Sequence, residues 1–214
     1  KPFFCMVSIF TPHNPYEDYP LEAGKRIDEA RIREPLIRED EFVGKPADLL
    51  REHHSSYLGD FANYSREDLR RMRFGYHASI AFADQEFGRL LETLDSLELT
   101  ENTLVIFTSD HGDMLGDHQL LVKGAFFYDP NVRVPLLLRW PAQLHAGLRT
   151  PALVQNHDLA ATILAAAGAD AADLAAWMPE ARDLLPIGRG ETNAVHREAV
   201  CCYRNSGISG EPNR

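Results

Sequence analysis

The fold class follows from residues 103–118, which read TLVIFTSDHGDMLGDH. The first six of these residues are mainly apolar, with β-branched and aromatic members, a pattern typical of a strand buried in a sheet. The chain then turns polar, and three Asp and two His follow between Ser109 and His118. Because ligands bind beyond the carboxyl ends of strands in open α/β sheets, this loop is the first candidate for a functional site.

Further strands are expected on both sides of this stretch. Residues 3–10 are apolar on both faces, which predicts a strand buried in a parallel sheet. Shorter strands are predicted at residues 134–140, 152–154 and 198–203, and the last of these would bury two adjacent cysteines.

Helical patterns separate these strands. A long helix is predicted from an N-cap at Ser65. The apolar residues at helical spacing that should form its core face are Tyr76, Ile80, Ala83, Phe87, Leu90, Leu91, Leu94 and Leu97. A second helix is predicted over residues 159–167, capped by Asp158 and stopped by Gly168. Strands that alternate with helices predict an α/β fold with a mostly parallel sheet flanked by helices.

Residues 17–65 interrupt this pattern. They are polar, charged and poor in periodicity, which predicts a long excursion with short helices. Long insertions of this kind act as lids or specificity loops, or they are solvated elaborations without a role in chemistry. Both alternatives are open.

Composition limits the classes of function. Hydrophobic residues make up 44% and charged residues 25% of the 214 residues, as in ordinary soluble globular proteins. The formal net charge of −10 argues against a nucleic-acid partner. No apolar run approaches the roughly 20 residues that span a bilayer, and three cysteines do not make a disulfide framework.

Asp110 and His111 stand where the chain leaves the predicted strand, and a turn there can direct both side chains at one ion. A carboxylate and an imidazole suit a divalent cation, and Gly112 would relieve the backbone crowding that such a turn requires. The alternative is that Asp110 caps a turn and His111 only packs. The position after a strand and the neighbouring acids favour the metal site.

Several segments stand in an order and spacing that belong to a known family. They are residues 11–16 (TPHNPY), 108–118, 123–124 (KG), 127–129 (FYD), 133–136 (RVPL), 158–164 (DLAATIL) and 182–186 (RDLLP). Together they resemble the C-terminal part of the catalytic domain of a type I sulfatase, a family of the alkaline phosphatase superfamily. The resemblance covers residues 1–16 and 75–205 and is weak over residues 17–65.

The resemblance implies roles for four residues. Asp110 and His111 would be metal ligands, while His13 and Lys123 would bind the sulfate group and would stabilise or protonate the leaving-group oxygen. Many relatives have Asn in place of His111. Ca²⁺ is the expected cation, with Mn²⁺ as an alternative because an imidazole suits a transition ion better. From the residues alone, a solvated charge is the favoured interpretation of Lys123, and His13 is equally well explained as a turn residue or as a site residue.

Asp117 and His118 are expected to support the loop rather than to ligate an ion. The nucleophile of the family is a formylglycine made from Cys or Ser in a Cys/Ser-x-Pro/Ala-x-Arg motif, and no cysteine of this chain has that context. We expect the formylglycine, two metal-binding aspartates and the N-terminal strands to lie upstream of Lys1. Residues 1–214 are thus predicted to be a partial catalytic domain, inactive alone, with the core and the metal-binding loop in residues 66–205.

The predicted function of the full-length parent is hydrolysis of a sulfuric ester, and the expected partner is a small-molecule or carbohydrate sulfate ester. One alternative is a phosphonate monoester or phosphodiester hydrolase of the same superfamily. Another is a non-catalytic remnant of the fold. The identity of the substrate, the oligomeric state and the compartment stay open.

Overall fold

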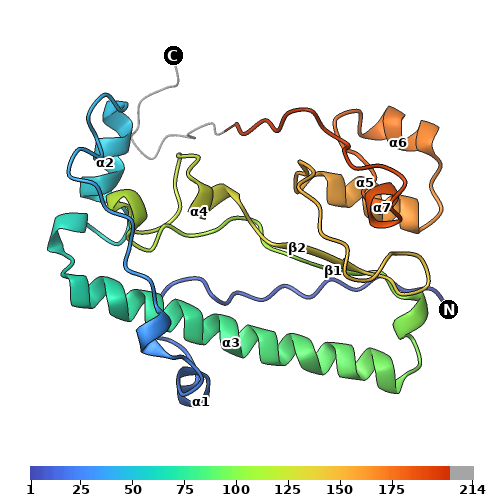
Figure 1. Cartoon of the computed structure of the whole chain (residues 1–214), viewed down its shortest axis with the longest axis horizontal. Coiled ribbons are helices and arrows are strands. Elements are labelled where there is room, and N and C mark those ends of the chain that lie inside the picture. The colour runs from blue at the N-terminus through green and yellow to red at the C-terminus, as the bar shows by residue number, and fades with distance from the viewer. Residues whose placement is uncertain (203–214) are drawn as a thin grey trace. The chain divides into compact units, whose positions relative to one another are not determined.

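The computed structural model describes residues 1–202 and divides into two compact units (Figure 1). The first unit consists of Lys1–Thr93 and Gly112–Asn131. The second unit consists of Leu94–His111 and the described residues from Val132 onward. No helix in the described residues is both long enough and apolar enough to cross a membrane.

The first unit is built from helices and turns. Its helices are α1 (Leu21–Gly24), α2 (Ala47–Ser55), most of α3 (Arg66–Ser96) and most of α4 (Asp129–Val132). Its 3-10 turns are Glu29–Arg31, Phe61–Asn63 and Asp117–Gln119. The excursion of residues 17–65 thus carries two short helices and two 3-10 turns.

The long helix α3 begins as predicted, directly after Ser65. The backbone N–H and the hydroxyl of Ser65 donate to Asp68 Oδ2, at 2.9 and 2.6 Å, and the Asp68 N–H donates to Ser65 Oγ. This reciprocal pair satisfies backbone donors that the first turn of a helix leaves free. The predicted core face was placed too far along the helix. The buried residues are Leu69, Met72, Gly75, Ala78 and Ser79, whereas Ile80, Leu90 and Leu97 are exposed.

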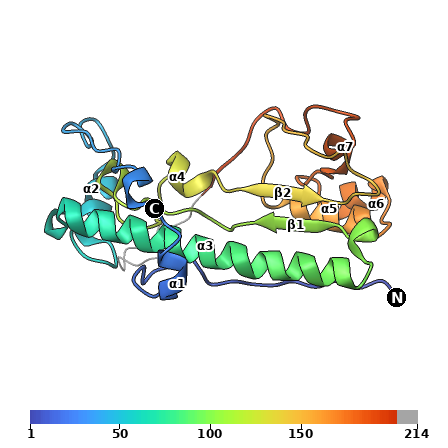
Figure 2. The same ribbon diagram turned by 60° about the horizontal axis from the view of Figure 1, so that its bottom comes forward.

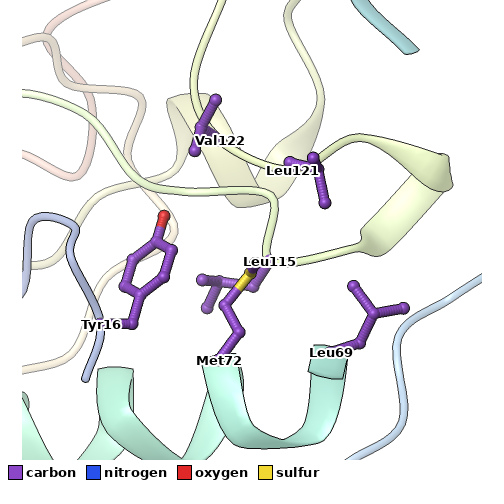
Figure 3. Packing of buried hydrophobic residues seen from close by; sticks show 6 residues of the cluster. All are labelled: Tyr16, Leu69, Met72, Leu115, Leu121 and Val122. Atoms are coloured by element: carbon purple, nitrogen blue, oxygen red, sulfur yellow. The ribbon is translucent and has the colours of Figure 1, made fainter. Parts of the chain in front are cut away.

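The core of the first unit lies where the start of α3 meets the loop that follows Gly112. The buried cluster contains Tyr16, Leu69, Met72, Leu115, Leu121 and Val122. Figure 3 shows Leu69 and Met72 rising from α3 toward the loop that carries Leu115, with Tyr16 beside them. The apolar residues of the loop therefore pack it against α3.

The second unit contains the only sheet in the described residues. Its elements are a 3-10 turn at Thr100–Asn102, β1 (Val105–Thr108), β2 (Leu136–Arg139), α5 (Asp158–Ala166), α6 (Ala171–Trp177) and α7 (Leu185–Gly188). The two strands pair antiparallel, from Val105 opposite Arg139 to Thr108 opposite Leu136 (Figure 2). The mostly parallel sheet that the pattern predicts is therefore absent from residues 1–202.

Three predicted strands are wrong in the described residues. Residues 3–10, 152–154 and 198–202 form no strand, and Tyr203, the end of the last prediction, lies outside the described residues. A strand requires a neighbour whose backbone groups pair with its own, and these segments pair with none in the described chain. Most of their apolar side chains are exposed, including Phe4 at 71%, and so are Cys201 and Cys202, which were expected to be buried.

The second predicted helix is present as α5. Gly168 adopts φ +97° two residues after its end, and its N–H donates to the carbonyl of Ala165, so the predicted stop is confirmed. Asp158 is the first helical residue rather than the residue before it. Its carboxylate accepts the backbone N–H groups of Gln155 and Arg182, so it ties neighbouring loops to the helix start.

Candidate functional site

His13 and Lys123, 110 positions apart in the sequence, lie together in the first unit. Lys123 Nζ is 2.5 Å from His13 Nε2. His13 Nδ1 is 2.8 Å from the carbonyl oxygen of Asn14. A carbonyl oxygen can only accept, so Nδ1 carries a proton and the neutral ring presents the lone pair of Nε2 to the ammonium of Lys123. The ammonium of Lys123 therefore donates to His13 Nε2.

Tyr57, from the excursion, completes this group. Its hydroxyl accepts a hydrogen bond from Lys123 Nζ at 2.9 Å and donates to the side-chain oxygen of Asn14. The Lys123 ammonium also lies 5.1 Å from the centroid of the Tyr57 ring, within the range of a cation–π contact. Sequence reasoning missed Tyr57, because nothing in the polar stretch around it marks this tyrosine as different from any surface aromatic residue.

The turn that carries His13 is held against α3 and the polar loop. Tyr16, 3% exposed, donates its hydroxyl to Asp113 Oδ2 at 2.7 Å. Burial and the nearby Asp113 carboxylate raise the pKa of Tyr16, so the phenol stays protonated and keeps donating. Gly75 on α3 lets the Tyr16 backbone approach closely, since a Cβ there would lie 1.8 Å from the Tyr16 carbonyl oxygen.

Asp110 and His111 follow β1 in the second unit, as predicted. Asp110 Oδ1 accepts the backbone N–H of His111 at 3.0 Å, and Asp110 Oδ2 lies 3.7 Å from His111 Nε2. Partial burial raises the pKa of Asp110, but hydrogen bonds and attraction to the His111 imidazole outweigh it, so the net pKa lies below its ordinary value. The carboxylate is therefore ionised at neutral pH, and its side chain is 86% exposed.

The loop backbone at this position is fixed from the start of α5. The side-chain amide of Asn156 donates to the carbonyl oxygens of Ser109 and Asp110, at 3.0 and 3.2 Å. One NH₂ group thus clamps two successive carbonyl groups. In the first unit, Gly112 meets the crowding that the sequence predicts, because a Cβ there would lie 1.9 Å from the carbonyl oxygen of Pro130.

The donor chemistry of Asp110 and His111 fits part of a divalent cation site. Bonds of about 2.1–2.4 Å from one ion to Asp110 Oδ2 and His111 Nε2 are compatible with the 3.7 Å between these atoms. Two donors are fewer than the six or more that a hard cation prefers. Within residues 1–202, clusters of three potential ligands occur elsewhere, at His53, His54 and Asp60 and at His157, Asp158 and His196.

Asp117 is bound by its protein neighbours in the first unit. Its Oδ1 pairs with the guanidinium of Arg73 on α3 and accepts the backbone N–H of Leu36 at 2.7 Å. Arg73 also donates to the carbonyl oxygen of Leu115 at 3.0 Å. Asp117 therefore joins the excursion, α3 and the polar loop.

His118 is held in the same structural manner. Its Nδ1 is 2.8 Å from the buried Glu41 carboxylate, and its ring stacks on Tyr128 with centroids 4.1 Å apart. Its backbone N–H donates to the carbonyl oxygen of Leu36 at 2.7 Å. These contacts agree with the supporting role predicted for both residues.

The comparisons with known proteins identify the family. The family model described as Sulfatase matches residues 1–169, and the chain belongs to this family, the type I sulfatases of the alkaline phosphatase superfamily. Its structural neighbours have the α/β folds of sulfatases and phosphonate hydrolases, which confirms the predicted α/β class, although the sheet of residues 1–202 has only two antiparallel strands.

Individual relatives cover most of this chain. The choline-sulfatase of Rhizobium meliloti (strain 1021) is 33% identical over 196 residues, 89% of this chain and 36% of that protein. The uncharacterised sulfatase YidJ of Escherichia coli K12 is 33% identical over 177 residues, 78% of this chain and 32% of that protein. The phosphonate monoester hydrolase of Agrobacterium radiobacter superposes with a TM-score of 0.74 and 25% identity over 89% of this chain and 39% of that one. The chain spans about a third of the length of the curated relatives that it matches.

Proposed function

We propose that this chain belongs to a sulfuric ester hydrolase and contributes His13 and Lys123 to the leaving-group side of its active site. The observation that carries the proposal is the contact of 2.5 Å between Lys123 Nζ and His13 Nε2. The separation of an alcohol from sulfate develops negative charge on the departing oxygen. An ammonium donor backed by an imidazole stabilises that charge and supplies the proton that the alkoxide needs.

Within the group, each residue has a distinct task. Lys123 donates toward the substrate oxygen. His13 accepts from Lys123 at Nε2 and is oriented by the Asn14 carbonyl at Nδ1. Tyr57 holds the ammonium from the side of the excursion and narrows the positions that Lys123 can adopt. This contact supports the interpretation of residues 17–65 as a segment that shapes the site.

Asp110 and His111 would hold the divalent cation that the family resemblance implies. Ca²⁺ is the expected ion, with Mn²⁺ as the alternative that His111 favours. Bound there, the cation would neutralise charge on the sulfate oxygens and on the nucleophile. The nucleophile that the family implies is a formylglycine, and no cysteine of residues 1–214 stands in the motif for it.

The test is a pair of lysine substitutions in the full-length protein. Lys45 makes the same kind of contact as Lys123, a hydrogen bond of 3.1 Å and a cation–π contact to a tyrosine, Tyr128. We expect Lys123→Ala to lower kcat/KM for an aryl sulfate by about 100- to 1,000-fold, and Lys45→Ala to leave it within about twofold.

A double substitution sharpens the result. Because His13 and Lys123 act on one leaving oxygen, the variant that lacks both should lose little more activity than the more damaged single variant. Equal activity of the Lys123→Ala and Lys45→Ala variants, with both folded, would contradict the proposal.

A phosphonate monoester hydrolase is the second candidate. His111 and the structural neighbour of TM-score 0.74 favour it. The full-length protein should be assayed on an aryl sulfate and on an aryl phosphonate monoester with the same leaving group. A higher kcat/KM for the phosphonate would make this candidate the better description.

A further inference from the structure

We propose that the second unit holds another cation site, formed by His157, Asp158 and His196 at the start of α5, and that it takes a divalent transition ion such as Zn²⁺. One potential ligand atom from each residue lies within 4.8 Å of those of the others. The Asp158 side chain is fully buried, that of His196 is 11% exposed and that of His157 is 46% exposed. The cluster therefore has a buried anion at its base and one imidazole in contact with solvent, which gives an ion a path of entry.

The distances match those between ligands of one ion. His196 Nε2 lies 2.9 Å from Asp158 Oδ1 and 3.0 Å from Oδ2, and His157 Nε2 lies 3.7 Å from Oδ1. With bonds of about 2.1 Å, a nitrogen and an oxygen bound at right angles are about 3 Å apart, and at 120° about 3.6 Å apart. Both imidazoles can thus bind the ion that the carboxylate binds.

Asp158 has more nitrogen neighbours than its own hydrogen bonding needs. Oδ1 already accepts the N–H of Arg182 at 2.8 Å, and Oδ2 that of Gln155 at 2.7 Å. Each carboxylate oxygen offers about two lone-pair sites, so one remains on each. A single N–H of His196, 2.9 and 3.0 Å from the two oxygens, shares these remaining sites, and His157 Nε2 lies 3.7 Å from Oδ1 as a further nitrogen neighbour. A cation uses both oxygens and both imidazoles at once.

The donor set and its surroundings suit a borderline ion. Two imidazoles and a carboxylate are typical ligands of Zn²⁺ and similar ions. In the structure His157 Nε2 lies 3.2 Å from the carbonyl oxygen of Glu180, and an ion would replace the proton that this nitrogen donates there. The N–H groups of Gln155 and Arg182 fix the carboxylate, as outer hydrogen bonds do for metal ligands.

An ion bound at this cluster would connect segments that are distant in the sequence. It would join the start of α5 to the segments that carry Arg182 and His196. Asn156, the residue before His157, clamps the carbonyl groups of Ser109 and Asp110. An ion at the cluster would therefore steady the turn that fixes the Asp110 loop.

Co²⁺ tests the site, because its visible absorption reports coordination by imidazole. The starting protein carries Asp110→Asn and His111→Gln, so that the ligand pair of the proposed function is altered and the result does not depend on that function. We expect the absorption to saturate at one equivalent of Co²⁺ and to disappear when Zn²⁺ is added. His157→Gln and His196→Gln should each weaken binding roughly tenfold or more.

The matched control is His54→Gln, which alters the other histidine–aspartate cluster and should leave Co²⁺ binding unchanged. The proposal is overturned if His157→Gln binds Co²⁺ as tightly as the starting protein, or if His54→Gln abolishes binding. If the His196→Gln variant unfolds because Asp158 loses its partner, Co²⁺ binding by the His157→Gln variant is the test, because the side chain of His157 is half-exposed.

Discussion

The contact between α3 and the turn that carries His13 predicts opposite effects for the same substitution at two glycines of one helix. A Cβ at Gly75 would lie 1.8 Å from the Tyr16 carbonyl oxygen and 2.7 Å from its carbonyl carbon, whereas a Cβ at Gly88 meets nothing within 4 Å. Backbone atoms cannot rotate away as a side chain can. Helix and turn would have to separate by roughly 1 Å or more in a close-packed region.

The balance between helix propensity and steric overlap decides whether each substitution raises or lowers the free energy of unfolding. Replacing Gly by Ala inside a helix stabilises by about 1 kcal/mol through propensity. Overpacking costs about 1–3 kcal/mol, and the upper end applies where backbone atoms collide. We therefore expect Gly75→Ala to lower the free energy of unfolding by about 1–2 kcal/mol and Gly88→Ala to raise it by about 0.5–1 kcal/mol.

Urea melts of the two variants and the unchanged chain measure this difference. Amide hydrogen exchange of α3 should show faster opening around Gly75 in the Gly75→Ala variant and slower opening around Gly88 in the other. If Gly75→Ala stabilises the chain as much as Gly88→Ala does, the close approach of Tyr16 to α3 is wrong, and with it the position of the His13 turn.

Three further predictions test other contacts. Asp117→Asn should lower the free energy of unfolding by about 1–3 kcal/mol in urea melts, because it weakens a half-buried pair with Arg73; an unchanged midpoint would contradict this. Hydrogen bonds from Ser65 hold the pKa of Asp68 below its ordinary value, so the start of α3 should lose stability as pH falls through that lowered pKa. Ser65→Ala should raise the pKa of Asp68 in an NMR titration, and an unmoved titration curve would refute the cap. Tyr57→Phe in the full-length protein should lower kcat/KM for an aryl sulfate by about 2- to 10-fold, and unchanged kinetics would remove the hydroxyl from the site.

Local patterns predicted individual elements well wherever a short stretch contains its own signals. The cap at Ser65, the helix that follows it, the stop at Gly168 and the strand before Asp110 all appear in the structure. Each depends on backbone groups and side chains a few residues apart, so their energetics are local. Pairing of residues 3–10 depends instead on distant segments. No described residue pairs with them, and the strand predicted there does not form.

The residues of the candidate site also fall into those that local sequence predicted and those that only the tertiary structure brings together. Asp110 and His111 are neighbours in sequence, and their position after a strand was visible from the pattern of residues 103–118. The contact between His13 and Lys123 could not be predicted from the pattern, because no periodicity links positions so far apart. Only the family resemblance suggested that the two residues share a role. Neither the sequence pattern nor the family resemblance indicated a role for Tyr57 or Asn156.

The amino-acid order of this chain therefore specifies which segments can be helical or extended and where ionisable groups gather along the backbone. Folding in three dimensions specifies which of those groups face one another, as Lys123 faces His13 and as His196 faces Asp158. The physical reason is that helix caps and hydrophobic periodicity act over a few residues, whereas a hydrogen bond across 110 positions exists only after burial of Leu69, Met72 and Leu115 has brought its two ends together.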